Sequence, residues 1–172
     1  MCLPPERVDR LFAGMGCHEH GSLDLQLRNT MLTHMSLNVI VPMKTEINPD
    51  LLEFVKHSTD IYKDFIRPIL PTSLIYHHTP ETDEAYKNGF SVLEIATPDK
   101  TKGAITVFST ENNNGNSITI KPRGVAINKN YKIWLDNDRA SFNISGFSLI
   151  NNGISINLNS PMISELILFE EI

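Results

Sequence analysis

The sequence predicts an α+β chain in two unequal parts: a short α/β segment over residues 1–71 and an antiparallel β-sandwich over residues 72–172. From Leu74 onward apolar and polar residues alternate with a period of two, and turn residues recur at short intervals, which is typical of a sandwich. Before that point helix-like and strand-like segments alternate, which is the α/β pattern. One or two such strands cannot form a sheet alone, so we expect the first part to need partners.

The first 47 residues predict two strands and a helix. Leu11–Met15 is a candidate for a short buried strand, and a polar loop follows it. Ser22 is a suitable N-cap, and apolar residues then recur at helical spacing, which predicts a helix over residues 22–35. Leu37–Val41 is a short, uncharged strand of the kind that is buried on both faces of a parallel sheet.

The best-marked element is a helix that begins after Asn48, a residue type suited to the N-cap position. Pro49 takes the first helical position, where a missing N–H costs nothing. Pro68 disfavours a helical conformation at the residue before it, so the helix is predicted to end at Arg67. Its apolar stripe comprises Leu51, Phe54, Val55, Ile61, Tyr62, Phe65, Ile66 and Ile69.

The remaining segments predict short strands separated by turns. Asn151-Asn152-Gly153 is a strong hairpin signal, because Asn and Gly tolerate positive φ. The predicted strands are Leu74–His78, Phe90–Ala96, Gly103–Ser109, Ser117–Lys121, Tyr131–Asp136, Phe142–Ile144, Phe147–Ile150, Ile154–Asn159 and Leu166–Phe169.

Composition excludes several classes of protein. The net charge of -5, with acids and bases mixed along the chain, argues against a surface for nucleic acid or for acidic membranes. No apolar run approaches the roughly 20 residues of a membrane span. The first residues lack the pattern of a secretory signal, and two cysteines do not make a disulfide framework. Neither observation determines the cellular compartment.

Several segments, taken in order, resemble the C-terminal part of melibiase-type (clan D) α-galactosidases. They are YKDFIRPILPTSLIYHHTP, VLEIATPDKTKGAITVF, KPRGVAINKNYKIWLDN, SFNISGFSLINNGISINL and SPMISELILFE. The resemblance covers most of residues 36–172 and rests on the series rather than on any single motif. It implies that residues 1–71 are the last βα units of a (β/α)8 barrel and that residues 72–172 are the whole C-terminal sandwich.

The resemblance also implies retaining glycoside hydrolysis by the parent enzyme. The family's two catalytic aspartates lie on earlier barrel strands and have no counterpart here, so no catalytic residue carries over to this chain. The residues themselves agree, because retaining glycosidases need two carboxyl groups about 5–5.5 Å apart, gathered from the strand ends of a complete barrel. We therefore expect a fragment without a complete active site, with no cofactor and no metal. Its expected partners are a carbohydrate, reached through the parent enzyme, and the missing barrel portion or a neighbouring chain.

The densest polar cluster is the loop of His18, Glu19 and His20. One interpretation is a sugar-binding loop, in which these side chains bond hydroxyl groups. A second interpretation is a zinc site made by Cys17, His18 and His20, with His34 as a candidate fourth ligand, although the spacing matches no standard metal motif. The third is an ordinary polar loop.

Trp134 is a further candidate for substrate binding, because it lies on the polar face of its strand and its ring can stack on a sugar. The alternative places Trp134 at the seam between the two parts of the chain. His77 and His78 point to opposite faces of their strand, so they cannot easily chelate one ion. Arg28 is expected to serve solvation or local hydrogen bonds, and Arg123 to bind a neighbouring carboxylate.

Two other functions compete with the glycosidase fragment. A free-standing carbohydrate-binding module would keep the sandwich and use exposed aromatic side chains, of which the sequence offers few at predicted wet positions. A structural subunit would use its first residues to complete the barrel of another chain.

Overall fold

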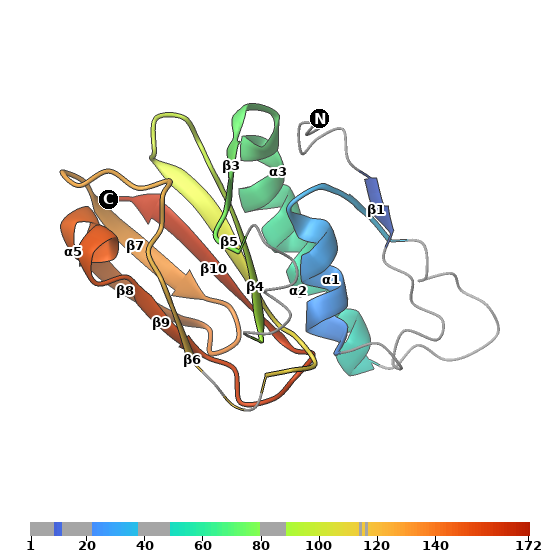
Figure 1. The fold of residues 1–172 in the computed structure, drawn as a ribbon. Coiled ribbons are helices and arrows are strands. Elements are labelled where there is room, and N and C mark those ends of the chain that lie inside the picture. Colours follow the sequence, from blue (N-terminus) through green and yellow to red (C-terminus); the bar gives the residue numbers. More distant parts are fainter. Residues whose placement is uncertain (1–8, 12–21, 38–48, 80–88, 114, 116) are drawn as a thin grey trace.

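The computed structural model describes residues 9–11, 22–37, 49–79, 89–113, 115 and 117–172. In these residues a six-stranded antiparallel sheet is covered by helices on one face and by a two-stranded sheet on the other. Figure 1 shows these layers, with a further strand on the far side of α1 from the large sheet. No helix in the described ranges is long and apolar enough to cross a membrane.

The first described elements are a strand, a helix and a strand, β1 Asp9–Leu11, α1 Leu23–Met31 and β2 His34–Ser36. β1 and β2 pair in parallel, as the α/β pattern predicts. The predicted helix over residues 22–35 is too long, because it ends at Met31. Met35 instead pairs with Arg10, and its N–H donates to the Tyr62 hydroxyl.

The two strands predicted in this region fall mostly outside the described residues. Leu11 is in a strand as predicted, while residues 12–15 lie beyond the described ranges. Of the strand predicted at 37–41, only Leu37 is described, and it lies just after β2.

The long helix continues past the predicted stop at Arg67. α2 Pro49–Ile61 leads into a π-helical turn, η3 Tyr62–Ile66, then α3 Arg67–Ile69 and a 3-10 turn, η4 Leu70–Thr72. The Arg67 N–H donates to the Tyr62 carbonyl, five residues back. This wider turn directly precedes Pro68, whose ring would clash with a carbonyl of a regular helix, so the chain remains helical through the proline. The predicted cap at Asn48 lies outside the described residues.

The large sheet has the strand order β3-β4-β5-β10-β7-β8, and β6 pairs with β9 in the small sheet; all these pairs are antiparallel. Period-two alternation located each of these strands to within one or two residues at most ends. Their bounds are β3 Leu74–His77, β4 Phe90–Ala96, β5 Lys102–Ser109, β6 Ser117–Ile120, β7 Asn130–Leu135, β8 Ala140–Ser145, β9 Ile154–Asn157 and β10 Ser164–Glu171.

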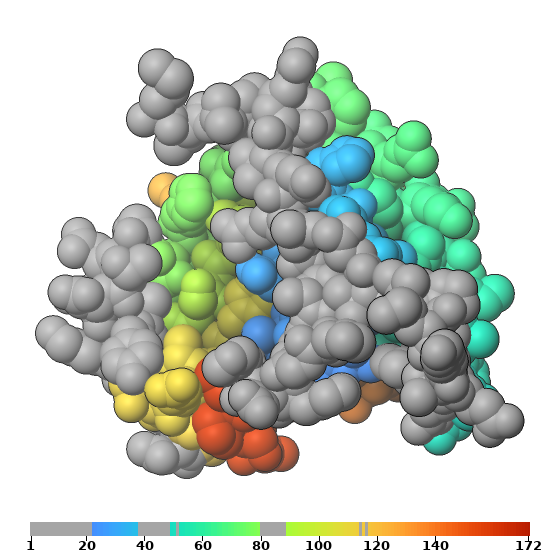
Figure 2. Space-filling view, turned by 90° about the vertical axis from the view of Figure 1, so that its right-hand side faces the viewer, coloured from blue at the N-terminus to red at the C-terminus, as the bar shows by residue number. Residues whose placement is uncertain are grey.

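Both faces of the large sheet are covered by apolar side chains. On one face, Phe90 and Val92 of β4 pack in a core with Ile154 and Ile156 of the small sheet. On the other face, Ile95 of β4 packs with residues of the helices, which include Met31, Tyr62, Ile66, Ile69 and Leu70. The helices therefore complete a core that the sheet alone would expose to water. Figure 2 shows the molecule turned by 90°, with residues 49–72 along the right-hand side.

The predicted strand Phe147–Ile150 is wrong, because these residues form a helix, α5 Gly146–Asn151. The Ser145 hydroxyl caps this helix by accepting a bond from the Ser148 N–H. The predicted hairpin that follows is wrong as well, since β9 pairs with β6. Gly153 does take a positive φ of 77°, but as the residue that ends α5: its N–H donates to the Leu149 carbonyl.

Candidate functional site

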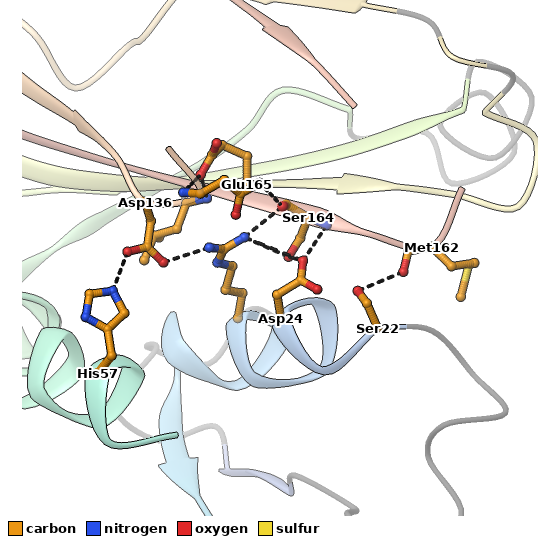
Figure 3. A network of polar contacts seen from close by, with 10 residues as sticks. Ser22, Asp24, His57, Asp136, Met162, Ser164 and Glu165 are labelled. Atoms are coloured by element: carbon orange, nitrogen blue, oxygen red, sulfur yellow. Dashed lines mark hydrogen bonds and ion pairs between the residues drawn. The ribbon is translucent and has the colours of Figure 1, made fainter. Parts of the chain in front are cut away.

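The most developed polar site is a cluster that joins α1 to the end of β7 and the start of β10 (Figure 3). At its centre is Arg28, whose side chain is only 2% exposed. One guanidinium nitrogen lies 2.6 Å from Asp136 Oδ2, and the other donates to the Ser164 carbonyl at 2.7 Å. A buried guanidinium with such short, charge-assisted bonds fixes the helix on the sheet in one position.

Asp136 connects this cluster to the second helix. Its carboxylate is 8% exposed, and its other oxygen, Oδ1, lies 2.7 Å from Nε2 of His57 on α2. One carboxylate in the loop after β7 therefore contacts side chains from both α1 and α2.

Asp24 and Ser22 extend the cluster along the beginning of α1. The Asp24 carboxylate accepts bonds from both the N–H and the hydroxyl of Ser164, each at 2.8 Å. It also lies 3.6 Å from the Arg28 guanidinium. The hydroxyl of Ser22 donates to the Met162 carbonyl at 3.0 Å. The start of α1 is thus bound at several points to the chain that leads into β10.

Glu165 lies beside this cluster and is 5% exposed. Burial raises the pKa of its carboxyl group, against the lowering effect of the bond from the Asn137 N–H and of the positive charge of Arg28. Its Oε1 accepts bonds from the N–H groups of Asn137 and Leu166.

A second buried carboxylate, Glu94, lies on β4 at the far side of the sheet from the helices and has no exposed surface. It accepts bonds from the Arg123 and Gly124 N–H groups, the shorter at 2.6 Å, and its Oε2 lies 2.6 Å from Nε2 of His78. Gly124 is required here, because a Cβ would lie 2.2 Å from that of Ala96. The pKa of Tyr76 is raised by burial and by the negative charge of Glu94.

These carboxylates are placed for structure rather than for catalysis. Asp136, Glu165 and Glu94 are buried, and their oxygens are bonded to protein donors, so a sugar could not reach them without unfolding the site. In the part of the chain that the structure describes, no group of three or more His, Cys, Asp or Glu side chains is arranged to hold a metal.

Trp134 lies where the helices meet the sheet. Its ring packs edge-on against Phe65, with centroids 6.2 Å apart, and Lys132 Nζ lies 4.9 Å from the ring centroid. Lys102 covers the Phe65 ring in turn, at 4.1 Å. The strand alternation placed Trp134 on a polar face, and the structure shows that the helices cover this part of that face.

The other predicted site residues are placed as follows. His18, Glu19, His20 and Cys17 lie outside the described residues. The expectation for Arg28 is wrong, because its partners are distant in sequence and buried. For Arg123 the backbone N–H, rather than the guanidinium, binds the carboxylate of Glu94. The partners in both clusters come from segments far apart in sequence, which local patterns cannot reveal.

The fold is similar to that of α-galactosidases of known structure. The galactosidase domain of the α-galactosidase–sucrose kinase AgaSK matches with a TM-score of 0.75 and 11% identity, over 98% of this chain and 22% of that chain. The GH36 α-galactosidase AgaA from Geobacillus stearothermophilus, as a variant in complex with stachyose, matches with a TM-score of 0.74 and 15% identity over the same shares. Another AgaA variant, in complex with raffinose, has a TM-score of 0.59 and 16% identity, over 75% of this chain and 17% of that one.

No protein-family model and no curated protein sequence matches the chain. The similarity to the solved structures shows that the chain has the fold of the C-terminal part of GH36 α-galactosidases. It spans 22% of the length of the first two structures that it matches.

Proposed function

We propose that this chain is the C-terminal part of an α-galactosidase-like glycoside hydrolase. Residues 72–172 form a sandwich that buttresses the catalytic barrel, and residues 1–71 form the last βα units of that barrel. The observation that carries the proposal is the fold, which follows α-galactosidase structures over 98% of this chain and only 22% of theirs. Because these structures are α-galactosidases, we propose terminal α-linked galactosides as substrates of the whole enzyme.

The order β1-α1-β2-α2 supports the barrel assignment. β1 and β2 are parallel and adjacent, with a helix between them in sequence, which is the repeating unit of a (β/α)8 barrel. In such a barrel the helices surround the strands. Here the helices lie between the strand pair and the large sheet, so the sheet covers their outer side (Figure 1).

The polar cluster around Arg28 supports the buttressing role. It binds α1 to the sheet through the buried Arg28–Asp136 pair and α2 through the contact between His57 and Asp136, and the hydroxyl of Tyr62, the first residue of η3, accepts a bond from β2. A shift of the sheet would therefore be transmitted to the strand pair. The carboxylates of this cluster are bonded to protein groups and are therefore not free to act in glycoside hydrolysis. We assign the catalytic pair to the earlier barrel strands.

His18, Glu19 and His20 are the residues that we propose to contact sugar, because residues 12–21 follow the carboxyl end of β1, and the loops after the strands form the active site of such barrels. Replacing each by alanine in the full-length enzyme is expected to weaken sugar binding, measured by calorimetry. Unchanged binding would remove these residues from the site. Trp134→Ala is the comparison variant for these alanine changes. We expect it to lower the stability of the protein, because the Trp134 ring packs on Phe65.

The coding DNA upstream of Met1 provides the test of the fragment assignment. We expect the reading frame to continue upstream and to encode barrel strands with paired aspartates. A stop codon in that frame, with no separate gene for such a barrel in the same genome, would contradict the proposal.

A further inference from the structure

β8 is an edge strand of the large sheet that lacks the usual protection against pairing. Its six residues, ASFNIS, include no charged residue and no proline, and its first four are exposed. Natural edge strands are commonly protected by charge, proline, a bulge or a covering segment. An uncharged, exposed edge is therefore a surface on which another strand can add to the sheet.

The hydrogen-bond pattern shows which groups face outward. The Gly146 N–H donates to the Lys129 carbonyl, and the pattern alternates along an antiparallel pair, so Ile144, Phe142 and Ala140 also bond to β7. Ser141, Asn143 and Ser145 then direct their backbone N–H and C=O groups to the open edge. Ser145 is the N-cap of α5, so its C=O accepts the first bond of that helix and only its N–H remains at the edge. Within the described part of the chain, no backbone bond from another segment reaches the outward groups of Ser141 and Asn143.

Apolar side chains gather beside this edge. Of the six exposed large hydrophobic residues in the described ranges, Phe142 and Phe147 belong to β8 and α5. Ile172 is exposed as well, and its N–H donates to the carbonyl of Asn130 on β7. A hollow of about 370 Å³ also lies here, lined by Asn130, Asn143, Ile144, Ser145 and Ile172.

We propose that β8 pairs with β8 of a second copy of this chain, antiparallel about a two-fold axis through Asn143, so that the two large sheets become one. Directly opposite residues must share a face of the sheet, so such an axis has to pass through a residue position. Through Asn143, the outward groups of Ser141 meet those of Ser145 in the second copy, and Asn143 meets itself. The Asn143 pair makes two bonds, and each Ser141–Ser145 pair makes one, from the Ser145 N–H to the Ser141 carbonyl, about four in all.

Side-chain chemistry favours this register over its neighbours. It places Phe142 opposite Ile144 of the second copy, an aromatic and β-branched pair of the kind that stabilises sheets. It also places the serine hydroxyls opposite one another, beside the hollow. An axis through Phe142 or Ile144 would leave one outward residue of each strand opposite a residue beyond the end of the other. The absence of charge on β8 allows the strand to face a copy of itself without repulsion.

Sedimentation equilibrium of the purified chain, over a concentration series up to millimolar, tests the interface. We expect dimers for the wild type. Asn143→Lys places like charges opposite one another and should raise the dimer dissociation constant roughly tenfold or more, and Asn143→Asp should do the same. Asn157→Lys, the same change at an exposed position of β9, should leave the dissociation constant unchanged.

An equimolar mixture of the Asn143→Lys and Asn143→Asp chains is the most specific experiment. The two new charges lie face to face only if residue 143 of one copy is opposite residue 143 of the other. We expect the mixture to recover the dimer. A wild-type chain that remains monomeric overturns the interface, as does an Asn143→Lys chain that dimerises like the wild type. A mixture that stays monomeric, with both variants folded by circular dichroism, overturns the register. None of these outcomes depends on the glycosidase assignment.

Discussion

Replacing Arg28 by methionine is expected to destabilise the chain by about 3–5 kcal/mol, the range measured when one partner of a buried ion pair is removed. Methionine keeps most of the length of the side chain but none of the charge. The Asp136 carboxylate, 8% exposed, would lose its shortest contact, and the Ser164 carbonyl would lose a donor at 2.7 Å. Urea unfolding of the purified chain at fixed protein concentration measures the loss.

Arg67→Met is the matched control, since Arg67 is an exposed arginine on the same helical layer; we expect its effect to remain within about 0.5 kcal/mol. The double variant Arg28→Met with Asp136→Asn should recover part of the loss, because it removes the carboxylate charge that the first change leaves unpaired. A loss below about 1 kcal/mol for Arg28→Met would mean that the cluster does not hold the helices on the sheet.

Glu94→Ala is expected to cost about 3–5 kcal/mol as well, for a different reason. The alanine leaves the Arg123 and Gly124 N–H groups without their acceptor and leaves a space in a fully buried site. The turn that follows β6 would lose its attachment to β4. The same urea titration, with the intrinsic fluorescence of Trp134 as the signal, reports the change.

Glu94→Gln keeps the size of the side chain and one carbonyl oxygen, so it should lose less than the alanine variant and remain measurable if the alanine variant does not fold. Glu170→Ala is the control, because this glutamate is 46% exposed and pairs only with Lys102 in the described structure. Equal effects of the alanine changes at 94 and 170 would contradict the role assigned to the buried carboxylate.

The alternation of residues was enough to locate the large sheet. In β7, for example, Tyr131 and Ile133 are fully buried, while Lys132 between them is not. Alternation did not reveal that the helices cover the other face near Trp134, because a half-polar face has the same residue pattern whether water or a helix lies on it. The strand order was also inaccessible, since β10 inserts between β5 and β7 although it comes last in the sequence.

Two of the wrong predictions made from the sequence have local physical causes. Pro68 is a reliable sign of a helix end only if the preceding turns are regular, and the π-helical turn at Tyr62–Ile66 makes room for it. Phe147–Ile150 is an apolar run of four residues, which suits either a buried strand or a short helix. The Ser145 cap and Gly153 decide for the helix, and both are visible in the sequence as capping residues once a helix is considered.

The candidate site was the least predictable part. Arg28 is bonded to residues 108 and 136 positions further along the chain, and Glu94 to a turn about thirty residues away. Sequence periodicity reports the burial of a face, not the identity of a partner across it. A buried arginine within an otherwise amphipathic helix is therefore found only when the fold brings its acceptors into place.

Turnover of an aryl α-galactoside by the purified 172-residue chain tests the proposed function most directly, since we assign the catalytic carboxylates to polypeptide that this chain does not contain. We predict no hydrolysis above the uncatalysed rate at any concentration of the folded chain. Hydrolysis that copurifies with the chain and persists after a second, independent purification would contradict the account.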